Sequence, residues 1–146
     1  MLQRIQSIFL LLAGAASLGL FGVPFATTPK AVEGSMIFAD AAYNVQDQPA
    51  LMALFGVAGA LALVGIFLFG NRLLQMRMSI FAFIANLIGV VFGVLFFMQN
   101  SNDVEGAAIN DSLGAYLPIV AMILLLVAYR FINKDEKLVR SMDRLR

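Results

Sequence analysis

Long apolar runs alternate with short polar segments along this chain. The apolar runs cover residues 6–25, 51–69, 78–98 and 113–132. The only charged residue inside these runs is Arg130, near the end of the last one. At about 1.5 Å per helical residue, each run crosses or nearly crosses a hydrocarbon layer of about 30 Å. The pattern predicts an all-α membrane protein, an antiparallel four-helix transmembrane bundle in a single domain over residues 1–146.

The charges between the runs predict how the helices are oriented. Nine of the ten Lys and Arg residues lie in the first seven residues, in the segment between the second and third runs, and after Tyr129. The other two polar segments hold six of the nine Asp and Glu. Because basic residues concentrate in cytoplasmic segments, we expect both termini in the cytoplasm. The expected segments are outer loops at 26–50 and 99–112, a cytoplasmic connector at 70–77 and a cytoplasmic tail at 133–146.

The first run also has features of a secretory signal peptide. Arg4 precedes it, and the small residues Ala39-Asp40-Ala41 follow it. That cleavage-like site lies too far from the run, which is also longer than the apolar part of a usual signal peptide. We therefore expect an uncleaved first helix.

Composition narrows the chemistry that the chain can perform. Hydrophobic residues make up 61% of it and charged residues 13%, so it has more apolar surface than a soluble domain of this size can bury. It contains no Cys and no His. Cys is the usual thiolate nucleophile, His is the usual acid–base group near neutral pH, and both are common transition-metal ligands. We expect no cofactor, no metal and no enzymatic activity. The basic residues are explained by orientation and by anionic lipids, so we also expect no nucleic acid partner.

Few residues inside the runs are candidates for a special role. Asn86, near the middle of the third run, is expected to hydrogen-bond to a neighbouring helix; the alternative is that it lines a polar path. Pro118 is expected to kink the fourth helix in its outer third or to end its regular hydrogen bonding there for one turn. Gly89 and Gly93 form a GxxxG spacing that favours close helix packing within one chain, with a homo-oligomer seam as the alternative.

The outer loops contain polar and turn-forming residues. Residues 24–49 are long enough for a small ordered cap, and Ser35–Ala39 is a candidate for a short strand. Five acidic residues in these loops could in principle gather around a divalent cation, but their spacing fits no calcium loop. We expect instead a solvated negative face made of Asp40, Asp47, Asp103, Glu105 and Asp111.

The tail has an amphipathic helical pattern, with Leu138, Met142 and Leu145 on one stripe and charged residues around it. Two interpretations stay open: a helix that rests on the lipid headgroups, or a docking helix for another membrane or cytoplasmic protein. The residues expected to bind a partner or lipid are Arg72, Arg77, Lys137, Arg140, Arg144 and Arg146.

The cytoplasmic segments together resemble those of a known family. The opening MLQRIQS, the connector NRLLQMR and the ending KDEKLVRSMDRLR resemble an uncharacterised family of small four-span membrane proteins typical of Bacteroidetes. The resemblance covers the whole chain. It implies a multi-pass protein of the bacterial inner membrane and no particular activity.

These observations favour a non-enzymatic accessory or structural membrane protein that acts through a partner protein or through lipid. The alternative is a small channel or carrier for a neutral or lipidic molecule, with Asn86 and Pro118 lining its path. An intramembrane enzyme is disfavoured, because no ionisable side chain lies deep inside the runs.

Overall fold

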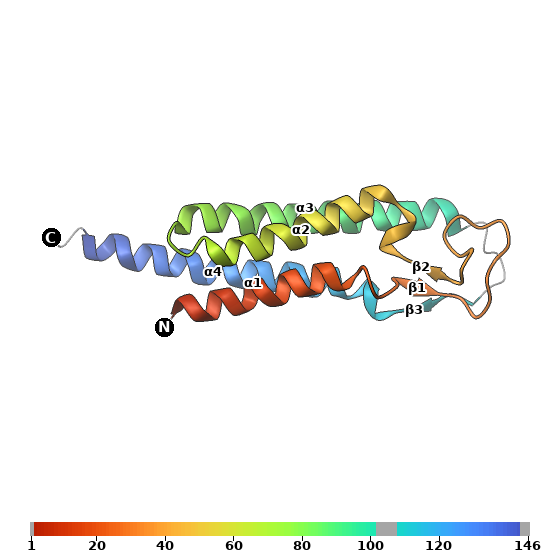
Figure 1. Cartoon of the computed structure of the whole chain (residues 1–146), viewed down its shortest axis with the longest axis horizontal. Helices are drawn as coiled ribbons and strands as arrows, with labels where there is room; N and C mark the ends of the chain where they lie inside the picture. The colour runs from red at the N-terminus through yellow and green to blue at the C-terminus, as the bar shows by residue number, and fades with distance from the viewer. Residues whose placement is uncertain (1, 102–107, 144–146) are drawn as a thin grey trace.

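Four helices pack side by side in an antiparallel bundle (Figure 1), as the sequence predicts. The computed structural model describes residues 2–101 and 108–143. The helices are α1 (Leu2–Gly19), α2 (Pro49–Phe67), α3 (Arg72–Asn100) and α4 (Leu117–Asp143). Each helix packs against the next, and α4 packs against α1, so the bundle closes. We call the end with the two termini the terminal end and the opposite end the cap end.

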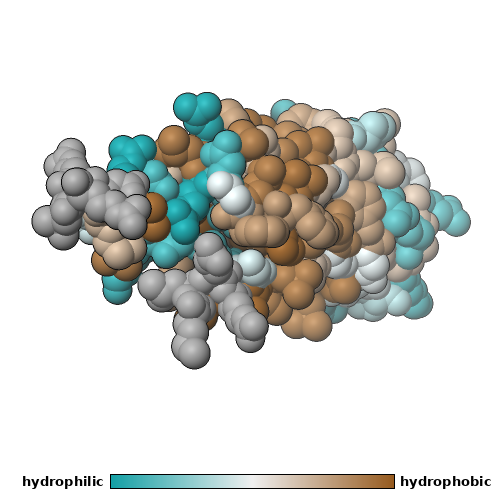
Figure 2. All heavy atoms as spheres, turned by 60° about the vertical axis from the view of Figure 1, so that its left-hand side comes forward, coloured by the Kyte–Doolittle hydropathy of each residue, from teal (hydrophilic) through white to brown (hydrophobic). Residues whose placement is uncertain are grey.

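The bundle has small residues inside and large apolar residues outside. Ala13, Ala58, Ala82 and Ala121 are buried, whereas many Ile, Val, Leu and Phe side chains of the helices are half-exposed or more. Figure 2 shows this hydrophobic surface as a broad zone between hydrophilic ends. Three helices are long and apolar enough to span a membrane, and α1 is a shorter apolar helix. A surface of this kind is stable against lipid and not against water, so the chain is a multi-pass membrane protein.

The helices begin at residues suited to helix starts. Pro49 begins α2, where a missing N–H costs no hydrogen bond, and the Asn71 side chain accepts a hydrogen bond of 3.1 Å from the Leu74 amide at the start of α3. Because of this cap, α3 begins at Arg72, and both Arg72 and Arg77 are helical. The connector between α2 and α3 is therefore shorter than the expected 70–77.

The structure places Pro118 at the start of a helix and not inside one, so the expected kink has no place to form. The helix α4 begins at Leu117, so Pro118 lies in its first turn, where the ring displaces no intrahelical hydrogen bond. A short 3-10 turn, η3 (Leu113–Ala115), precedes it. At the other end, α4 runs without a break from the apolar span into the charged tail and projects beyond the other helices (Figure 1).

A small antiparallel sheet closes the cap end. Its strands are β1 (Ala26–Thr27), β2 (Ala42–Tyr43) and β3 (Asn110–Asp111), in the order β2-β1-β3. A 3-10 turn, η1 (Val45–Asp47), leads from β2 into α2. In the register of the sheet, Ala26 lies opposite Tyr43 on one side and Asp111 on the other. The sheet therefore ties the two outer loops together.

The strand expected at Ser35–Ala39 is wrong. This segment forms turns, in which the Ser35 hydroxyl accepts hydrogen bonds from the amides of Ile37 and Phe38. Both Ile37 and Phe38 are buried in the same cluster beneath the cap. A strand would point neighbouring side chains to opposite faces, so two consecutive buried residues favour the turn.

Candidate functional site

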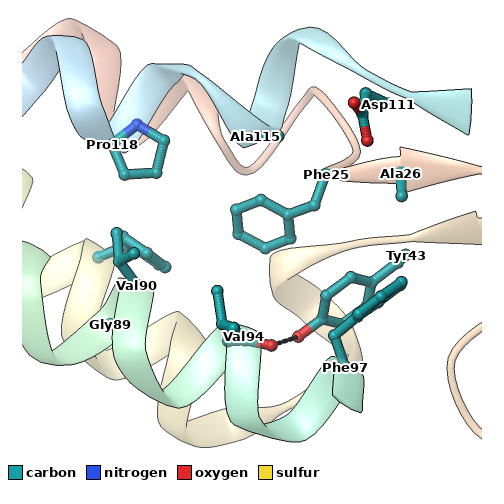
Figure 3. Close-up of a pocket in the computed structure, with 12 residues that line it drawn as sticks. Phe25, Ala26, Tyr43, Gly89, Val90, Val94, Phe97, Asp111, Ala115 and Pro118 are labelled. Atoms are coloured by element: carbon teal, nitrogen blue, oxygen red, sulfur yellow. Dashed lines mark hydrogen bonds between the residues drawn. The ribbon is translucent and has the colours of Figure 1, made fainter. Parts of the chain in front are cut away.

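An apolar pocket of about 240 Å³ lies at the cap end of the bundle, between α3, α4 and the sheet (Figure 3). Phe25 of the loop before β1 points into the space between the two helices. Carbon atoms make up nearly all of the lining, which includes Phe25, Phe55, Val90, Val94, Phe97 and Pro118. Among the described residues that line the pocket, Asp111 is the only charged one.

Small residues on the facing helices create this space. Gly89 and Gly93 lie on the inner face of α3, and Ala115 and Pro118 lie on the opposite wall. The Phe55 ring fills the region in front of Gly89, where an added Cβ would lie 2.8 Å from the ring carbon Cζ. The two glycines therefore have different surroundings, although both belong to the GxxxG spacing seen in the sequence.

Aromatic contacts and one hydrogen bond join the residues on one side of the pocket. The Phe25 ring lies 5.3 Å from the Tyr43 ring and 6.0 Å from the Phe55 ring, measured between centroids. The Tyr43 hydroxyl donates a hydrogen bond of 3.1 Å to the Gly93 carbonyl (Figure 3). Burial, and secondarily the nearby Asp47 carboxylate, raises the pKa of Tyr43, so this residue stays a neutral phenol with its proton engaged.

Asn86 does not line this pocket. It is fully buried in the middle of the bundle, and its amide nitrogen donates to the Ser17 hydroxyl at 3.1 Å and to the Ala82 carbonyl at 3.2 Å. Ser17 lies on α1, diagonally across the bundle from α3. The structure thus places Asn86 in a hydrogen-bonded layer between helices, and it separates Asn86 from Pro118, which does line the pocket.

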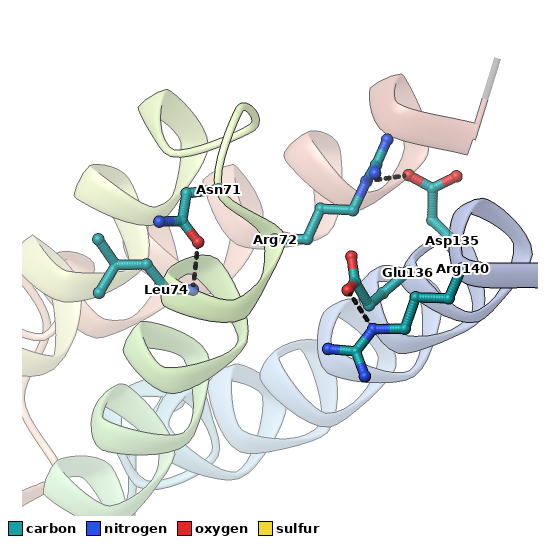
Figure 4. Close-up of polar contacts among 6 residues, drawn as sticks. All are labelled: Asn71, Arg72, Leu74, Asp135, Glu136 and Arg140. Carbon is teal, nitrogen blue, oxygen red and sulfur yellow. Dashed lines mark hydrogen bonds and ion pairs between the residues drawn. The ribbon is translucent and has the colours of Figure 1, made fainter. Parts of the chain in front are cut away.

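The basic residues at the terminal end are partly engaged in ion pairs (Figure 4). Arg72 Nε lies 2.9 Å from a carboxylate oxygen of Asp135, which joins α3 to α4. Arg140 pairs with Glu136 one turn away on α4, at 2.8 Å. Arg77 is exposed on α3. Two further expected residues, Arg144 and Arg146, lie outside the part of the chain that the structure describes.

One face of α4 carries basic residues that the sequence reasoning did not single out. Arg130 and Lys134 are exposed beside Lys137, and together with Asn133 and Leu138 they line a shallow hollow of about 330 Å³. Their spacing of four and three residues puts them on the same side of a helix, and this was the signal available in the sequence. We call Arg130, Lys134 and Lys137 the basic face.

The acidic residues of the cap form no group of three or more that could hold a metal ion, as far as the described residues show. Asp103 and Glu105 lie outside the described residues. Asp47 accepts a hydrogen bond of 2.6 Å from the Asn44 amide, and burial raises the pKa of Asp47 despite this bond.

Comparison with known protein families gives a match over nearly the whole chain. The model of a family described as "Domain of unknown function (DUF4293)" matches residues 2–145. No curated protein and no solved structure matches the chain.

Proposed function

The chain belongs to the DUF4293 family, whose description assigns no activity, and we propose that it is a non-enzymatic accessory component of the membrane that acts by binding a lipid in the cap-end pocket. The observation that carries this proposal is the apolar pocket between α3 and α4. We further propose that the protein resides in the bacterial inner membrane with both termini in the cytoplasm. The charge pattern supports this orientation, in which the cap end and its pocket lie at the outer leaflet.

The size of the pocket indicates how much of a ligand it can hold. Pockets for drug-sized molecules have volumes of about 300–1,000 Å³, so a volume of about 240 Å³ suits a segment of an acyl chain or a small apolar molecule. Inside a bilayer the hydrophobic effect does not favour the pocket over surrounding lipid, because lipid tails are equally apolar. Affinity must then come from shape and from polar contacts at the mouth.

The mouth of the pocket favours one class of lipid. Asp111 stands at the end nearest the sheet, and its side chain is exposed (Figure 3). A carboxylate there repels an anionic headgroup and attracts an ammonium group. A lipid with a neutral or amine-bearing headgroup therefore fits this site better than an anionic lipid.

The lipid can be detected by mild extraction from the native membrane followed by native mass spectrometry of the purified protein. We expect a bound lipid in the unmodified chain, retained after exchange into fresh detergent. Ala115→Leu fills the pocket and should abolish this retention. Ala53→Leu makes the same change on an exposed position of α2 and should leave it intact. Equal retention by both variants, or no retained lipid in the unmodified chain, would refute the proposal.

A second candidate role lies at the terminal end, where the basic face could bind an anionic lipid headgroup or an acidic segment of a partner protein. The observation that favours it is the exposure of Arg130, Lys134 and Lys137 around one hollow on the projecting helix. In a pull-down from the native membrane, K134Q/K137Q should lose a stoichiometric partner that Lys30→Gln, a charge change in the cap, retains. A path lined by both Asn86 and Pro118 is not favoured, because Asn86 is packed and hydrogen-bonded away from the pocket.

A further inference from the structure

Two glutamines at the terminal end are buried without a partner. Gln6 on α1 and Gln75 on α3 are both 0% exposed, and neither the oxygen nor the nitrogen of either side-chain amide has a hydrogen-bond partner among the described residues. Buried amides in folded proteins are almost always hydrogen-bonded, to protein or to ordered water. Four unpaired atoms in two fully buried side chains therefore require an explanation.

The helix register places the two glutamines at the same level of the core. Helices α1 and α3 run in the same direction, and the hydrogen bond between Ser17 and Asn86 aligns them. Gln6 and Gln75 each lie eleven residues before the corresponding member of that pair. Eleven residues make close to three helical turns, so both glutamines lie on the same faces as Ser17 and Asn86, about 16 Å nearer the terminal end.

The described neighbours of the amides are already hydrogen-bonded or paired elsewhere, and some of them are partly exposed to solvent. The Ser79 hydroxyl, one turn further along α3, already donates to the Gln75 backbone carbonyl at 3.0 Å. One turn in the other direction, Arg72 pairs with Asp135, and their side chains are 22% and 14% exposed. The two glutamines thus lie about one helical turn from a partly exposed ion pair.

We propose that Gln6 and Gln75 form an internal site for water, which enters from the terminal end past Arg72 and Asp135. Each amide presents both a donor NH₂ and an acceptor oxygen. Water is itself donor and acceptor, so it can satisfy both kinds of atom. A cation would leave the NH₂ groups unpaired, and an anion would leave the oxygens unpaired. The site is separate from the lipid pocket, which lies at the opposite end of the bundle.

The test uses the unmodified chain in nanodiscs with deuterated lipids and with ¹⁵N-labelled glutamine side chains. We expect strong cross-peaks between water and the side-chain NH₂ groups of Gln6 and Gln75, together with slow exchange, as a long-lived internal water gives. Gln99 is exposed on α3 and serves as the reference for a side chain that contacts only short-lived surface water. Its NH₂ group should show weak cross-peaks to water and fast exchange. The single variants Gln6→Leu and Gln75→Leu assign the two signals.

Two results would overturn the proposal. Cross-peaks between the two amides with none to water would show that the glutamines bond directly to each other. Water contacts no stronger than those of Gln99 would show that no water is held. In Q6L/Q75L the cross-peaks assigned to the site should vanish while the Gln99 signal persists, and any strong water cross-peak that remained there would also count against the site.

Discussion

The two glycines of the α3 GxxxG spacing should respond differently to the same substitution. Gly89→Ala would place a Cβ 2.8 Å from Cζ of Phe55, and also 3.0 and 3.2 Å from two further carbons of the ring. Gly93→Ala would place its Cβ 3.6 Å from a Leu51 methyl group and 3.8 Å from the Tyr43 hydroxyl oxygen, which are ordinary contacts. The motif is the same at both positions, and only the neighbour differs.

The expected difference can be estimated from the packing. Phe55 is only 1% exposed, and its ring packs against Phe25, so it cannot easily move away from a new methyl group. Overpacking of this kind costs about 1–3 kcal/mol. Both substitutions gain about 1 kcal/mol of helix propensity in a water-based scale, and this gain cancels when the variants are compared. We expect Gly89→Ala to be less stable than Gly93→Ala by about 1–3 kcal/mol.

The comparison requires reversible unfolding in mixed micelles, with a denaturing detergent as titrant and far-ultraviolet circular dichroism as the signal. The variant G89A/F55L removes the clashing end of the ring and should recover part of the lost stability. If Gly89→Ala and Gly93→Ala have the same unfolding free energy within about 0.5 kcal/mol, the packing argument is refuted.

Three further predictions concern polar groups. A double-mutant cycle of Asn86→Ala and Ser17→Ala should give a coupling of about 0.6–1.7 kcal/mol in the same unfolding assay, as expected for a hydrogen bond between membrane helices; additive effects would mean that this bond contributes nothing. A cycle of Arg72→Gln and Asp135→Asn should give a smaller coupling of about 0.2–1 kcal/mol that weakens as salt is added, because the pair is partly exposed, and a salt-independent coupling would contradict this. Burial raises the pKa of Asp47 in the folded protein above 3.8, its value in the unfolded chain. The folded state therefore binds the Asp47 proton more tightly, and the resulting contribution to stability is fully present below pH 3.8. This contribution is lost as the pH rises through the pKa of Asp47 in the folded protein. Asp47→Asn should flatten this fall in a pH series of unfolding measurements, and an unchanged slope would show that another group is responsible.

The candidate sites were only partly predictable. The sequence singled out Asn86 because a lone amide in an apolar run requires a partner, but it did not identify Ser17, which is distant in the chain and diagonal in the bundle. It singled out Arg72 and Arg140 as residues that bind a partner or lipid, but it did not identify their ion-pair partners. Folding brings Asp135 to Arg72, and the helical geometry of α4 brings Glu136 to Arg140. The division into a span ending at residue 132 and a tail separated Arg130 from Lys134 and Lys137, while α4 is continuous and carries all three on one side.

The sequence by itself determined the class of fold and the number of helices. The length of an apolar run can be counted along the chain and compared with the thickness of a bilayer, without knowledge of any tertiary contact. The distribution of charge between the segments can be read in the same way. The tertiary structure alone decided where Pro118 lies relative to the helix start and that the Phe55 ring lies against Gly89 and not against Gly93. It also decided that Gln6 and Gln75 are fully buried with no hydrogen-bond partner among the described residues. These features depend on which side chains meet across the bundle, and such contacts join residues far apart in the chain. Periodicity along one helix gives the face that each residue occupies but does not give the neighbour on the other side.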